Sequence, residues 1–220
     1  MPTLPGRGLA FGLNDSIFSL ISTARNLRFR RNSQLFIQTE QTPNPATLKF
    51  LPGEAVLESG TADFSNLEQA TGNSPLAESL FGIEGVAAVF FGGDFITITK
   101  AADQDWFVMK PAILGVIMEH YTAGGPVMTE NAATIGASTA SDDDDEIVTQ
   151  IKELIDTRVR PAVAMDGGDI VYHGFEDGIV YLQMQGACAG CPSSTATLKM
   201  GIENMLRHYI PEVLEVRSSI

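Results

Sequence analysis

The feature that most constrains the fold is a low-complexity stretch, residues 123–145, between two segments of ordinary globular composition. It is rich in Gly, Ala, Ser and Thr and ends in four consecutive aspartates. Such a stretch has little apolar surface to bury and its like charges repel one another, so we expect an acidic flexible linker. A chain of 220 residues has room for one domain on each side. The sequence predicts an α+β fold class, with two small α+β domains at residues 36–122 and 146–218.

The first segment mixes short strand patterns with two helical patterns. Ser74 followed by Pro75 is typical of a helix start, because serine caps the free amides and proline fits the first helical position. Gly92 and Gly93 separate two apolar runs, which predicts a hairpin. The expected strands are residues 36–39, 46–51, 86–91 and 95–99, and the expected helices are residues 76–81 and 106–121.

The second segment opens on apolar residues at helical spacing. These residues form one stripe along a helix predicted over 146–164, and they are Ile147, Ile151, Leu154, Ile155 and Val159. Two strands at 170–175 and 178–185 follow, then a helix at 193–209 and an edge strand at 213–216. We expect no crossover helix between parallel strands in this domain.

Charge is distributed unevenly along the chain. Residues 1–35 contain five Arg and one Asp, although the whole chain has a net charge of −13. An Arg-rich, acid-poor start resembles a mitochondrial presequence, so we predict a disordered leader at 1–35, either a presequence or an upstream start artefact. The acidic remainder would repel phosphate backbones, which argues against nucleic-acid binding. No apolar run reaches the roughly 18 residues needed to span a bilayer, so no membrane partner is expected.

Cys188 and Cys191 are the only cysteines of the chain. A secreted disulfide scaffold of this size would contain more, so the pair indicates metal binding or redox chemistry in a reducing compartment. Pro192 fits the first position of the following helix, which would place Cys191 at the positive end of the helix dipole. That position favours thiolate over thiol. We therefore expect two activated thiolate ligands in this loop.

Two thiolates do not complete a metal site, because structural zinc and cubane iron clusters usually take four protein ligands. The histidines His120, His173 and His208 are scattered and are expected to play no part. The simplest completion is a symmetric dimer in which each chain donates two thiolates. Two alternatives stay open: a thioredoxin-like dithiol oxidoreductase, and a structural zinc ion that staples a dimer. The domain is short for a thioredoxin sheet.

Two sets of motifs resemble the Nfu family of iron–sulfur scaffold proteins, over roughly residues 36–218. In the second domain the matching text is Arg160-Pro161, Asp166-Gly167-Gly168-Asp169, Gly186-Ala187-Cys188-Ala189-Gly190-Cys191-Pro192-Ser193-Ser194 and Leu198-Lys199. The first domain resembles the N-terminal domain of that family through Phe36-Ile37-Gln38-Thr39, Thr42-Pro43-Asn44-Pro45, Leu48-Lys49-Phe50, Ile83-Glu84-Gly85-Val86 and Asp94-Phe95-Ile96-Thr97.

The resemblance implies a non-enzymatic carrier. In this family Cys188 and Cys191 would bind a 4Fe–4S cluster that bridges a homodimer and passes to apo iron–sulfur proteins, in partnership with the cluster-assembly machinery. Bacterial members commonly begin near Phe36 and mitochondrial ones carry a leader; we favour a bacterial cytoplasm, with the mitochondrial matrix as the alternative. For Asp166–Asp169 we expect the glycines to shape a helix-to-strand turn and both aspartates to accept from backbone amides.

Overall fold

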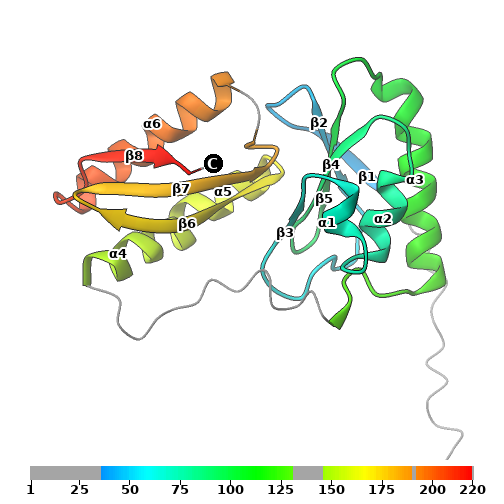
Figure 1. Cartoon of the computed structure of the whole chain (residues 1–220), viewed down its shortest axis with the longest axis horizontal. Coiled ribbons are helices and arrows are strands. Elements are labelled where there is room, and N and C mark those ends of the chain that lie inside the picture. Colours follow the sequence, from blue (N-terminus) through cyan, green and yellow to red (C-terminus); the bar gives the residue numbers. More distant parts are fainter. Residues whose placement is uncertain (1–35, 131–145, 190–191, 220) are drawn as a thin grey trace, which may run out of the picture. The chain divides into compact units, whose positions relative to one another are not determined.

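The computed structural model describes residues 36–130, 146–189 and 192–219, and they form two α+β domains, as predicted (Figure 1). The expected leader, residues 1–35, lies outside the described residues. So do residues 131–145 of the expected linker and, within the cysteine loop, Gly190 and Cys191.

The first domain is built on a five-stranded antiparallel sheet in the order β1-β2-β5-β4-β3. β4 and β5 form the predicted hairpin. β3 was not predicted from the sequence, because a strand of three residues is too short to show alternation. The strands are β1 (Gln38–Gln41), β2 (Thr47–Leu51), β3 (Ala62–Phe64), β4 (Val86–Phe91) and β5 (Ile96–Lys100).

Three helices complete this domain: α1 (Leu67–Ala70), α2 (Pro75–Phe81) and α3 (Trp106–Ala123). α2 begins as predicted, with Pro75 at its first position and the hydroxyl of Ser74 accepting from the amide of Ala77 at 3.1 Å. α3 begins at Trp106, where the side chain of Asp105 accepts from the amide of Phe107. It ends at Gly124, whose φ of 71° is readily adopted only by glycine.

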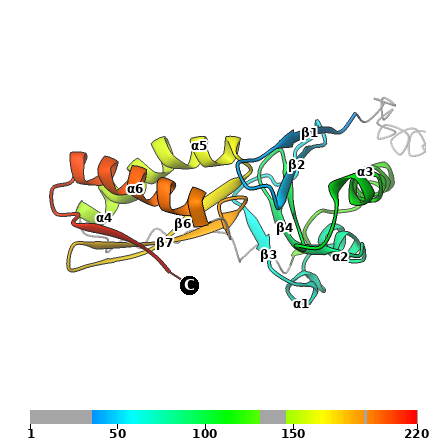
Figure 2. The ribbon, with the colours of Figure 1, turned by 90° about the horizontal axis from the view of Figure 1, so that it is seen from above.

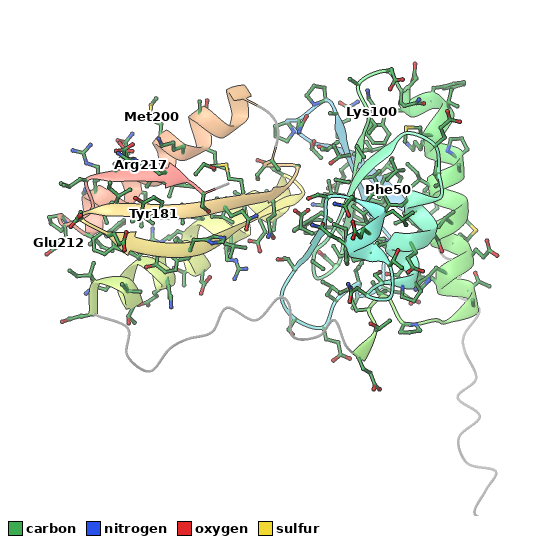
Figure 3. The ribbon with its side chains drawn as sticks, viewed as in Figure 1. Phe50, Lys100, Tyr181, Met200, Glu212 and Arg217 are labelled. Atoms are coloured by element: carbon green, nitrogen blue, oxygen red, sulfur yellow. The ribbon has the colours of Figure 1, made fainter. Side chains whose placement is uncertain are left out.

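α2 and α3 cover one face of the sheet (Figure 2). Alternate residues of β2, β4 and β5 point toward these helices and form the core of the domain. Phe50, labelled in Figure 3, is fully buried there. The largest contributors from strands and helices are Phe50, Phe91, Ile96, Ile98, Leu76, Leu80, Ile113 and Ile117.

The second domain opens on one long helix with a wide turn inside it. α4 (Glu146–Leu154) runs into a π-helical segment (η2, Ile155–Val159) and then α5 (Arg160–Met165). The amide of Arg160 donates to the carbonyl of Ile155, five residues earlier. Pro161 has no amide hydrogen to donate into the preceding turn, and the wider turn makes room for its ring. The predicted helix therefore exists, but it is not a regular α-helix throughout.

The second sheet has the order β6-β7-β8, with β6 (Gly168–Glu176) antiparallel to β7 (Ile179–Gly186). β8 (Glu215–Ser218) pairs parallel to β7, and α6 (Pro192–Tyr209) joins the two. The expectation of no crossover helix between parallel strands was wrong. The direction of a C-terminal strand depends on which end of the sheet the preceding helix leads to, and the local sequence pattern does not determine this.

The helices of the second domain pack on one face of its sheet (Figure 2). The predicted stripe on α4 and η2 contributes Ile151, Ile155 and Val159 to this core. On the other side of the core, β7 alternates buried and half-buried residues, with Val180 and Leu182 fully buried. Met200 on α6, labelled in Figure 3, is 64% exposed and points away from the core. Across the described residues no helix is long and apolar enough to cross a bilayer.

Replacing Ser74 with Ala tests the cap of α2. The serine hydroxyl accepts from Ala77 and donates to the carbonyl of Val127 at 2.6 Å, and the residue is fully buried. Ser74→Ala should lower the free energy of unfolding of the first domain by about 1–3 kcal/mol, measured by chemical denaturation. Ser79→Ala, at an exposed position of the same helix, is the matched control and should change it by no more than about 0.5 kcal/mol. Equal effects would contradict the assigned cap.

Candidate functional site

Two turns meet at one end of the β6–β7 hairpin. The first, Asp166–Gly167, connects α5 to β6, and the second, Gly186–Ala189, begins the loop between β7 and α6. The register pairs Gly168 directly with Gly186, the first residue of β6 with the last of β7. The two turns that carry the glycine and cysteine motifs of this domain are therefore neighbours in space.

Backbone hydrogen bonds fold the second turn tightly. The amide of Cys188 donates to the carbonyl of Gln185 at 3.3 Å, and that of Ala189 to Gly186 at 3.1 Å. The amide of Ala187 crosses to the first turn and donates to Gly167 at 3.1 Å. Gly186 has a φ of 60° and Gly167 a φ of 84°, in the left-handed region where glycine carries little strain. The predicted role of glycine in shaping the helix-to-strand turn is confirmed at Gly167.

The absent side chain of Gly168 makes room for the thiol of Cys188. A Cβ on Gly168 would lie 2.6 Å from the Sγ of Cys188 and 2.6 Å from the carbonyl oxygen of Gln185. Real carbon atoms do not approach so closely, so either the thiol or the strand would have to move. The second glycine of the Asp166–Asp169 motif therefore places the cysteine.

Cys188 is buried in this conformation, with 6% of its surface exposed. Burial raises the pKa of its thiol to about 12, and the negative charges of Asp166 and Asp169 add to the effect. The expectation of an activated thiolate is therefore wrong for Cys188 as it lies here. The dipole argument concerned Cys191, which lies outside the described residues, although α6 does begin at Pro192 as predicted.

Asp169 forms a two-pronged ion pair with Arg160. Its Oδ1 accepts from Nε at 2.9 Å and its Oδ2 from Nη2 at 2.7 Å, and the carboxylate is almost fully buried. Oδ1 also accepts from the amide of Ile170 at 2.7 Å, which confirms the predicted backbone role for this aspartate. The Arg160 partner was missed, although Arg160-Pro161 stood among the motifs. A second arm of the guanidinium reaches exposed Asp156, four residues earlier.

The three histidines do not join this site. The Nε2 of His173 pairs with the side-chain oxygen of Gln183 at 2.9 Å, while His120 lies on α3 and His208 on α6. Among the side chains that the structure describes, no three of His, Cys, Asp or Glu are arranged to hold a metal ion.

Comparison with known proteins assigns both halves of the chain. The sequence profile described as "Scaffold protein Nfu/NifU N terminal" matches residues 37–124, and the "NifU-like domain" profile matches residues 151–217. The chain belongs to the Nfu family. Within this family, "NifU-like protein 4, mitochondrial" of Arabidopsis thaliana is 52% identical over 198 residues, which cover 89% of this chain and 70% of the plant protein.

The human relative is the "NFU1 iron-sulfur cluster scaffold homolog, mitochondrial". It is 56% identical over 180 residues, which cover 81% of this chain and 70% of the human protein. A solution structure of a NifU-like protein from Saccharomyces cerevisiae is 30% identical, covers 44% of this chain and 86% of that one, and has a TM-score of 0.40. These Nfu relatives from Arabidopsis and human are named mitochondrial, which agrees with the alternative location and gives no support to the bacterial cytoplasm that we favoured.

Gly168→Ala tests the space reserved for the thiol. The added methyl should displace Cys188 and cost about 1–3 kcal/mol of unfolding free energy. Labelling with iodoacetamide, followed by mass spectrometry, should then modify Cys188 faster than in the unchanged chain. Gly174→Ala, also in β6, meets nothing within 4 Å and serves as the control. Unchanged labelling in both variants would contradict the placement of the thiol by Gly168.

A pair of charge-matched variants tests the Arg160 ion pair. Asp169→Asn removes the buried charge, and we expect a loss of about 2–4 kcal/mol in unfolding free energy. Asp156→Asn removes the exposed charge from the same guanidinium and should cost less than about 1 kcal/mol. Denaturation of the full chain measures both, and similar losses would mean that the buried contact is not the stronger one.

Proposed function

We propose that the chain is a non-enzymatic iron–sulfur scaffold that binds a 4Fe–4S cluster between two copies of itself and transfers it to apoproteins. Cys188 and Cys191 of each chain would be the ligands. The observation that carries the proposal is the cysteine pair of an Nfu-family chain, with Cys188 on a tight turn shortly before the start of α6.

The donor set fits such a cluster. Thiolate sulfur is the usual ligand of iron in these clusters, and a cubane takes four of them. Each chain has only two cysteines, so a second chain supplies the other two. The residues beside Cys188 in the two turns are small, namely Gly167, Gly168, Gly186, Ala187 and Ala189. Small neighbours allow a bulky inorganic group and a second chain to approach the sulfur.

The buried state of Cys188 adds one requirement. Iron binds the thiolate, whereas burial beside two carboxylates favours the thiol. Cluster binding therefore has to move this sulfur out of its pocket and release its proton. A ligand that is buried when empty and exposed when loaded suits a protein that receives a cluster and later gives it away.

The proposed partners follow from this role. Apo iron–sulfur proteins would receive the cluster, and the cluster-assembly machinery would supply it. The mitochondrial names of the plant and human relatives support the mitochondrial matrix as the place of work. No feature of the described surface singles out one client.

Anaerobic reconstitution with iron and sulfide tests the proposal. Mössbauer spectra and elemental counts should show one cubane, with four iron and four sulfide ions, for every two chains. Sedimentation should show that cluster loading converts monomers into dimers. Zinc uptake alone would favour the structural staple, and a Cys188–Cys191 disulfide that turns over insulin would favour the dithiol enzyme. Either result would overturn the proposal.

Single substitutions locate the ligands. Cys188→Ser or Cys191→Ser should reduce cluster uptake to near zero, while the far-ultraviolet circular dichroism spectrum should remain that of a folded α+β protein. Met165→Ser is the control, because it removes an exposed sulfur beside the neighbouring Asp166–Gly167 turn, and a thioether sulfur cannot act as a thiolate. Full uptake by either cysteine variant would exclude that residue as a ligand.

A further inference from the structure

The first sheet buries a row of three residues, two of them polar, on the face that its own helices do not cover. The register places Lys49 opposite Thr97 and Thr97 opposite Phe90, across β2, β5 and β4. Their neighbours in sequence point into the core with the helices, so these three point the other way. All three are nevertheless buried, with Thr97 fully so. Something other than α2 and α3 covers this face.

The described parts of both domains belong to one compact unit, and the row is covered by the turns of the second domain. The hydroxyl of Thr97 donates to the carbonyl of Gly167 at 2.7 Å. The ammonium of Lys49 donates to the last carbonyls of α5, at 3.2 Å to Ala164 and 3.1 Å to Met165. A cation at this end of a helix is favourable, because the carbonyls of the last turn carry the negative end of the helix dipole.

The row continues on both sides of these contacts. Glu40, opposite Lys49, forms an ion pair with its ammonium at 3.3 Å. The ring of Phe90 lies against Gly186, where an added Cβ would come within 2.9 Å of it. Asp63, opposite Phe90, accepts from the amide of Gly186. The two turns at the cysteine end of the hairpin thus rest on the row, Gly167 on Thr97 and Gly186 on Phe90.

Asn44 extends this surface to the cysteine itself. Its Oδ1 accepts from the amide of Ala46 at 3.0 Å, which fixes the side chain in a local turn. Its Nδ2 then donates to the carbonyls of Ala187, at 3.4 Å, and Ala189, at 3.2 Å, the residues on either side of Cys188. Asn44 is 5% exposed, so both hydrogen bonds are shielded from solvent.

We propose that this face of the N-terminal domain is a binding surface for the empty cysteine loop through its described part, Gly186–Ala189, and the adjoining Asp166–Gly167 turn, and that it holds Cys188 buried. The surface consists of Asn44, Lys49, Phe90 and Thr97. The inference rests on the proposed function, since it is cluster binding that requires the loop to leave. Asn44, Lys49 and Thr97 bind backbone carbonyls, and Phe90 lies against Gly186, where a side chain would collide with its ring.

The closed loop and the shared cluster exclude one another. A cluster bridged between two chains needs Cys188 to face a second copy, whereas the closed loop buries it. The two states therefore compete for the same chains, and stabilising the closed loop weakens binding of the shared cluster. The N-terminal domain protects the empty thiol and sets how readily the loop accepts iron.

Asn44→Asp in the full-length apo chain tests the surface. The new carboxylate keeps the acceptor for Ala46 but places an oxygen against the carbonyls of Ala187 and Ala189, which repel it. Hydrogen–deuterium exchange of the peptide that contains these residues should accelerate about fivefold to thirtyfold. Initial rates of cluster uptake at limiting iron and sulfide should rise with it. Asn66→Asp, an exposed helix cap with the same change of charge, should alter neither.

The outcomes separate this inference from the proposed function. Exchange and uptake equal to those of the unchanged chain would overturn the binding surface, and slower uptake would instead make the N-terminal domain a helper in loading. Faster exchange in a chain that takes up no cluster in any form would support the surface and defeat the scaffold proposal. A third variant, Thr97→Val, keeps the shape but removes the donor to Gly167, and should shift exchange in the same direction.

Discussion

The geometry of the functional end depends on the pairing of Gly168 with Gly186 across the last rung of the β6–β7 ladder. Neither residue has a side chain, so the two turns approach until the amide of Ala187 reaches the carbonyl of Gly167. The thiol of Cys188 then occupies the volume that a Cβ on Gly168 would fill. The buried Asp169 carboxylate and the Arg160 guanidinium fix the same end of the strand. The position of the Cys188 sulfur is therefore set mainly by backbone contacts between the two turns, and less by the packing of the cysteine side chain.

Protection and reactivity make opposite demands on such a sulfur. A thiol that is shielded and protonated resists oxidation and adventitious metals, because the thiolate is the reactive form. Iron coordination needs that reactive form. A loop with two positions resolves the conflict, provided that some other part of the protein holds the first position. The row of Lys49, Thr97 and Phe90 on the first sheet would hold that position, and this explains physically why the N-terminal domain and the cysteine domain belong to one chain.

The sequence was informative where a pattern is local. Two apolar runs on either side of Gly92-Gly93 located β4 and β5, helical spacing located α4 and α6, and Ser74-Pro75 located the start of α2. The four-residue α1 and three-residue β3 were too short to predict, since neither completes enough of its period. The direction of β8 and the pairing of Arg160 with Asp169 depend on tertiary contacts. The cysteine pair is evident from the sequence. The burial of Cys188, however, depends on distant segments of the same chain, and it raises the pKa of the thiol where the sequence predicted a lowered one.

The π-helical segment at Ile155–Val159 has a consequence for how this chain tolerates change. Each residue turns an α-helix by about 100°. Removing one residue from the wide turn would restore a regular helix and swing everything after it, including the guanidinium of Arg160, by about that angle relative to α4. Three of its five residues, Asp156, Thr157 and Arg158, are exposed and can vary in kind. In homologous sequences, length should therefore be preserved at this place more strictly than identity, so that an alignment gap here would mark a rotated arginine and a differently braced cysteine loop.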